Sequence, residues 1–112
     1  MADDLVRTVR EMLHVTAPAM RELLTAEELA ATSTRVIRKA DGHSMLTIKH
    51  WPTVDPDEEL DDETLLEFHT FKDWGGSWMQ GRETATEMYE RFRSELQDFI
   101  AESKFGWGQW RP

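Results

Sequence analysis

The chain has 112 residues, 39% of them hydrophobic, a formal net charge of −9 and no cysteine. The missing cysteines exclude a disulfide framework, a thiol nucleophile and a thiolate zinc site, and the length fits one domain over residues 1–112. No apolar run approaches the roughly 18–20 residues of a membrane span, and the start of the chain lacks the pattern of a secretory signal. We therefore expect one small cytoplasmic domain that does not bind a membrane.

The first part of the chain, residues 1–32, is predicted to be helical. Apolar residues recur at helical spacing over residues 5–13. Pro18 interrupts this pattern, and Thr25 with Glu28 forms a capping box for a further short helix. The pattern leaves open whether the segments before Thr25 are separate helices or one kinked helix.

Residues 33–80 are predicted to form a three- to four-stranded antiparallel meander. Its first two strands would be the β-rich runs 33–40 and 43–51. They flank Asp41-Gly42, the strongest short hairpin signal in the chain. We therefore expect the first two strands to pair with each other directly.

A third strand is expected over residues 64–74, where β-branched and aromatic residues return. Gly75-Gly76 has the composition of a tight hairpin turn. Residues 77–80 would then form a short fourth strand that pairs back onto the third.

The last regular element is predicted to be a long helix over residues 82–103. Thr84 and Glu87 form its capping box, and an apolar stripe follows at helical spacing. An aromatic tail, residues 104–112, comes after it. Helices, then an antiparallel meander, then one long helix on a face of the sheet define an α+β domain.

Negative charge is concentrated in residues 51–73, which carry nine acidic side chains and one basic side chain. An acidic loop at 52–63 holds most of them. It fails as a calcium-binding EF-hand loop, because Leu60 and Leu66 stand where a glycine and a glutamate are required. The loop is predicted either as a solvated connection or as a surface that steers a basic protein partner. Nucleic acid is not expected to bind, since the same field repels phosphate. The acidic side chains of the loop are Asp55, Asp57, Glu58, Glu59, Asp61, Asp62 and Glu63.

Basic side chains gather only at Arg35, Arg38, Lys39 and Lys49. Because carboxylates are abundant nearby, we expect these side chains to form ion pairs within the domain.

Two histidines and one aspartate offer the best candidate for metal chemistry. If the predicted strands pair, His50 and His69 could lie close to Asp73 and complete a two-histidine, one-carboxylate site. Their spacing matches no compact ligand motif. Histidines on strands are usually surface residues or hydrogen-bonded structural residues, and this interpretation is preferred to the metal site.

Five tryptophans are present in 112 residues. Trp51 and Trp74 are expected in the core or at its edge, because they flank the predicted sheet. Trp78, Trp107 and Trp110 have two open alternatives: they close a small core, or they are exposed anchors at an interface.

Neither a catalytic motif nor a cofactor motif is present. The sequence therefore predicts a non-catalytic protein-binding domain of the inhibitor, immunity or anti-defence type, which occupies a basic surface on a larger partner. The acidic loop, Trp78, Trp107 and Trp110 would form the contact. One alternative is a small-ligand or metal-dependent enzyme that uses the two histidines and the aspartate. The other is a structural subunit of a homo-oligomer in which the aromatic tail docks on a neighbour.

Overall fold

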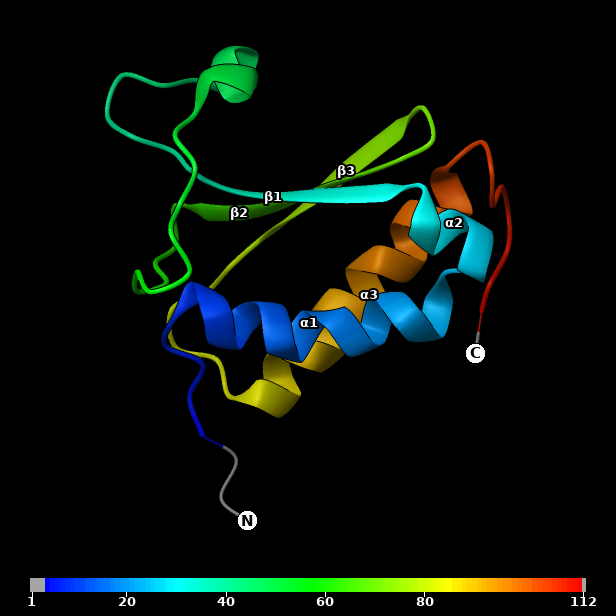
Figure 1. The fold of residues 1–112 in the computed structure, drawn as a ribbon, viewed down its shortest axis with the longest axis horizontal. Helices are drawn as coiled ribbons and strands as arrows, with labels where there is room; N and C mark the ends of the chain where they lie inside the picture. Colours follow the sequence, from blue (N-terminus) through cyan, green and yellow to red (C-terminus); the bar gives the residue numbers. More distant parts are fainter. Residues whose placement is uncertain (1–3, 112) are drawn as a thin grey trace.

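The computed structural model describes residues 4–111. Three strands form an antiparallel sheet in the order β1-β2-β3, and the helices α1 and α3 pack together against one face of this sheet (Figure 1). The predicted α+β class, with a meander between N-terminal helices and a long last helix, is confirmed. Within the described residues, no helix is long and apolar enough to cross a membrane. The elements are α1 (Val9–Leu23), α2 (Ala26–Ala30), β1 (Thr32–Arg38), the 3-10 helix η1 (Met45–His50), β2 (Thr64–Thr70), β3 (Asp73–Trp78) and α3 (Ala85–Glu102).

The helix α1 begins later than its apolar pattern predicts. Thr8 is the N-cap, and its side chain accepts a hydrogen bond from the amide of Glu11. The preceding Val6 is instead extended, and its amide donates to the carbonyl of Glu83 at 2.9 Å. The helix then continues through Pro18 to Leu23, so one helix is observed rather than two.

Both predicted capping boxes are confirmed. Thr25 and Glu28 cap α2 reciprocally, and Thr84 and Glu87 do the same for α3. In each box the threonine accepts from the third helical amide while the glutamate accepts from the amide of the cap.

The predicted hairpin at Asp41-Gly42 is wrong, although the turn itself is present. Gly42 has a φ of 85°, a left-handed conformation that glycine adopts easily. The chain after it forms η1 instead of a strand, and β1 pairs with β2, with Ile37 opposite Leu65. The reason lies in Trp51, which is 2% exposed and packs with Ile37 and Leu65 in a small second core.

The turn predicted at Gly75-Gly76 is also misplaced, because both glycines lie inside β3. The chain reverses at residues 71–72, and Phe71 adopts a φ of 55° there. Gly75 is required for close packing: a Cβ at this position would lie 2.7 Å from Phe99 Cδ1 and 2.9 Å from Phe68 Cε2. Strand β3 therefore joins the end of the predicted third strand, the predicted turn and the start of the predicted fourth strand.

The main core lies between the sheet and the helices α1 and α3, and a chain of aromatic contacts runs through it. Phe68 on β2 meets Phe92 and Phe99 on α3, with ring centroids 6.1 and 4.8 Å apart. Phe99 contacts Phe105, which contacts Phe71 in the β2–β3 turn. All five phenylalanines of the chain thus connect the sheet, the last helix, the tail and the hairpin turn.

The two faces of the sheet are covered unequally. Leu66 and Phe68 point to the helices, whereas Leu65, Glu67 and His69 alternate onto the outer face. Segment 43–51 covers only part of that outer face, where it buries Leu65.

Replacing Gly75 with alanine tests the close approach of α3 to β3. The added methyl group would overlap the buried ring of Phe68 and the half-buried ring of Phe99, so Gly75→Ala should lower the free energy of unfolding by about 1–3 kcal/mol in urea denaturation. Gly76→Ala is the matched control, because its methyl group would meet only the flexible end of Leu65, at 3.0 Å or beyond. Equal stability of Gly75→Ala and the native chain would contradict the packing described here.

Candidate functional site

The acidic loop is a fixed part of the fold rather than a free connection. Its main chain bonds to the start of α1: the amide of Val9 donates to Glu58, and the amide of Leu60 donates to Arg7. Val54 and Leu60 anchor it in the main core. The loop therefore presents its carboxylates from a defined backbone.

Ion pairs neutralise part of the loop. Asp57 pairs with Arg10 at 3.1 Å, and Arg38 lies within 3.3–3.6 Å of Asp61 and Glu58. Of the seven carboxylates of the loop, four form no ion pair within residues 4–111: those of Asp55, Glu59, Asp62 and Glu63.

The predicted internal pairing of the strand cations is confirmed for two residues. Arg38 bridges the acidic loop, and Arg35 bonds to the buried carboxylate of Glu67 at 3.0–3.1 Å. Arg10 and Arg38 together offset two of the seven negative charges of the loop.

The aromatic tail is held against the helices by hydrogen bonds. Gln97 on α3 donates to the carbonyl of Gln109 and accepts from the amide of Arg111, both at 3.0 Å. The Arg111 guanidinium then reaches the carboxylate of Glu28 and the carbonyl of Leu23. The tail is thereby fastened to the junction between α1 and α2.

The ion pair between Glu28 and Arg111 is largely buried, with side-chain exposures of 10% and 16%. The hydrogen bond from Arg111 lowers the pKa of Glu28 below its ordinary value, although burial opposes this. The same contact raises the pKa of Arg111. The charged form of Glu28 therefore stabilises the fold.

Trp107 and Trp110 are 77% and 72% exposed on this fastened tail. Of the two alternatives left by the sequence, they do not close the core. Gly106 lets the tail turn back close to α3, since a Cβ there would lie 2.6 Å from Ile100 Cγ2 and 2.8 Å from its carbonyl oxygen. The two indoles are large apolar surfaces held in a fixed place and open to solvent.

The remaining tryptophans lie on or beside the outer face of the sheet. Trp51 is buried as expected, and it contacts Trp78 with ring centroids 5.8 Å apart. Trp78 is nevertheless 38% exposed, and Trp74 is 51% exposed beside His69. The expectation that Trp74 belongs to the core or its edge understates its exposure.

The proposed metal ligands are not brought together. His50 ends η1 instead of a strand, His69 bonds to Glu67 at 2.8 Å, and Asp73 accepts from the amide of Lys104. In the part of the chain that the structure describes, no group of three histidine, aspartate or glutamate side chains is placed to hold a metal ion.

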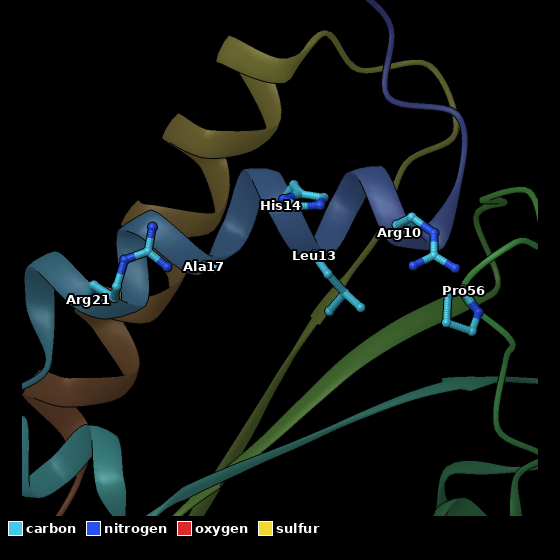
Figure 2. Close-up of a pocket in the computed structure, with 6 residues that line it drawn as sticks. All are labelled: Arg10, Leu13, His14, Ala17, Arg21 and Pro56. Atoms are coloured by element: carbon cyan, nitrogen blue, oxygen red, sulfur yellow. The ribbon is translucent and has the colours of Figure 1, made fainter.

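The outer side of α1 carries a shallow basic hollow that sequence reasoning missed. Figure 2 shows Arg10, His14 and Arg21 along one side of the helix, with Pro56 of the acidic loop at one end. Leu13 and Ala17 complete the lining. These three side chains are spread over twelve positions of the sequence, and only helical geometry gathers them on one side.

Comparison of the chain with protein-family models, with curated proteins and with solved structures finds no match in any of the three.

The buried ion pair yields a pH-dependent prediction. Arg111→Ala should lower the free energy of unfolding at pH 7 by about 2 kcal/mol, because it leaves the Glu28 carboxylate buried without its partner. Since the folded-state pKa of Glu28 is lowered, this contribution is present above about pH 4.3 and is lost as pH falls through the folded-state pKa. Urea denaturation from pH 7 to pH 3 should show the difference shrinking.

Arg10→Ala is the matched control, because its ion pair with Asp57 is exposed to solvent. It should cost less than about 0.5 kcal/mol at every pH. Equal effects of the two variants at pH 7 would contradict the role assigned to Arg111.

Proposed function

We propose that this chain is a non-catalytic protein-binding domain that docks on a basic surface of a larger protein, in the manner of an inhibitor, immunity or anti-defence protein. One observation carries this proposal: Trp107 and Trp110 stand exposed on a tail that Gln97 and Arg111 hold in place. A fixed, exposed indole loses little conformational freedom on binding, and tryptophan is the side chain most enriched at interface hot spots.

Charge supports the choice of a basic partner. The net charge of −9 remains after all internal pairing, because an ion pair cancels one charge of each sign. Four loop carboxylates without ion-pair partners, those of Asp55, Glu59, Asp62 and Glu63, supply long-range attraction. In this proposal the carboxylates increase the rate of association, and the side chains of Trp78, Trp107 and Trp110 make the contacts from which water is excluded.

Replacing both tail tryptophans tests the proposal. The double variant Trp107→Ala, Trp110→Ala should unfold within about 1 kcal/mol of the native chain, because both side chains are mostly in solvent. It should bind a partner captured by the native chain from its own cells about 30-fold or more weakly, which corresponds to the loss of a hot spot. Binding is measured by isothermal titration calorimetry or surface plasmon resonance with the purified partner.

Leu46→Ala is the control, since Leu46 is 93% exposed on η1, away from the tail. It should leave the affinity unchanged. Raising the salt concentration to 1 M should slow association, because exposed charges are then screened within about 3 Å. An unchanged affinity of the double variant would refute the role of the tail, and its failure to fold would assign the indoles to stability instead.

A further inference from the structure

The outer edge of β3 is an open row of main-chain hydrogen-bonding groups. The amide of Met79 donates to the carbonyl of Thr64 at 2.8 Å, which sets the alternation of the β2–β3 ladder. Gly75 and Ser77 then direct their main-chain groups to β2, whereas Trp74, Gly76 and Trp78 direct theirs away from the sheet. None of these outward groups has a hydrogen-bond partner within residues 4–111.

The other edge of the sheet is closed over part of its length. On β1, the carbonyl of Val36 accepts from the amide of Val54, and the amide of Arg38 donates to the carbonyl of Pro52. Segment 52–54 thus occupies the edge that β1 would otherwise offer. Natural sheets block exposed edges in this way, because an open edge recruits further strands.

A groove runs beside the open edge, between β3 and the second half of α3. The strand from Trp74 to Gly76 forms one side of the groove, and Phe68 with Phe99 adds apolar surface. The helix side carries three carboxylates, those of Glu95, Asp98 and Glu102. Glu95 is engaged by Arg91 and Ser77, whereas Asp98 and Glu102 are exposed and form no ion pair in the described chain.

These features define what an added strand would need. Its side chains alternate between two faces. Those on the helix side would lie near Asp98 and Glu102, which favour lysine or arginine. Those on the other side would lie beside the exposed rings of Trp74 and Trp78, which favour apolar residues.

A second copy of this chain does not fit the edge. Two β3 edges paired across a two-fold axis would bring the carboxylates of both α3 helices together, and each copy already carries a net charge of −9. The basic strand β1 of another copy is obstructed by its own residues 52–54. Charge complementarity therefore selects a basic segment from a different protein.

We propose that the edge of β3 binds an extended segment of another protein, with alternating basic and apolar residues, by strand addition. This site is separate from the aromatic tail and the acidic loop. Strand addition would be a second mode of binding, and it does not depend on the docking of the tail and the acidic loop on a basic partner.

The test uses the full chain and two synthetic ten-residue peptides. One alternates lysine with valine, and the other has the same composition with the lysines and valines in separate blocks. The alternating peptide should shift the amide NMR signals of Trp74, Gly76 and Trp78, and it should bind about tenfold or more tightly than the block peptide. Equal binding of the two peptides, or no binding of the alternating one, would overturn the proposal.

Two kinds of variant locate the site. Gly76→Pro removes only an outward amide, so the β2–β3 ladder stays intact. This variant should weaken peptide binding about tenfold relative to Gly76→Ala.

The charge variant Asp98→Lys with Glu102→Lys should weaken peptide binding by a similar factor, and it tests the site even if the proline variant does not fold. Glu27→Lys with Asp41→Lys, at exposed positions outside the groove and the acidic loop, is the charge-matched control and should bind like the native chain. An equal loss of peptide affinity in both charge variants would refute binding at the edge of β3.

The double variant Trp107→Ala, Trp110→Ala separates this proposal from the preceding one. It should bind the alternating peptide normally even though it fails to retain the cellular partner. Loss of peptide binding in that variant would place the peptide on the tail and refute the strand-addition site.

Discussion

The contact of Phe68 with Phe92 and Phe99 is the interaction on which the rest of this fold depends. It joins the central strand to the long last helix. Gly75 permits it, because any side chain there would occupy the space of the two rings. Once α3 is held this close to β3, the tail that follows the helix and the strand edge beside it both acquire defined positions.

Two kinds of surface result from this arrangement. The tail turns back at Gly106 and is fastened by Arg111 to Glu28, which leaves Trp107 and Trp110 in solvent. Among the residues that the structure describes, none bonds to the outer edge of β3, and α3 lies against one face of the sheet (Figure 1). An exposed aromatic pair and an open strand edge both carry a risk of non-specific association. A high negative charge counters that risk and still admits basic partners.

Local signals in the sequence predicted the elements that local chemistry determines. Both capping boxes, at Thr25 and Thr84, form as their spacing indicates, and the order of helices and strands follows from periodicity. The start of α1 was harder to predict: the apolar residues before Val9 continue the helical pattern, yet Val6 bonds to the segment before α3. That contact joins residues far apart in the chain, so no local pattern reports it.

The wrong predictions for the strand pairing and for the metal site have the same physical origin. Asp41-Gly42 forms a turn, but the segment after it is drawn into η1 by the burial of Trp51, so His50 never reaches a strand beside His69. Gly75-Gly76 resembles a hairpin turn, but both glycines lie inside β3, and Gly75 permits the packing of Phe99 from α3. In both cases a long-range contact overrides the local preference, and composition alone does not reveal which rings meet.

Amide hydrogen exchange in the free protein tests the central claim most directly. If Phe99 packs over Gly75 and leaves the edge of β3 open, the amides of Gly75 and Ser77 should exchange slowly and those of Trp74, Gly76 and Trp78 rapidly. This alternation along a single strand, read by NMR, is the predicted result. Uniformly slow exchange from Trp74 to Trp78 would mean that the edge is covered, and uniformly rapid exchange would mean that α3 does not hold the strand; either would contradict the account.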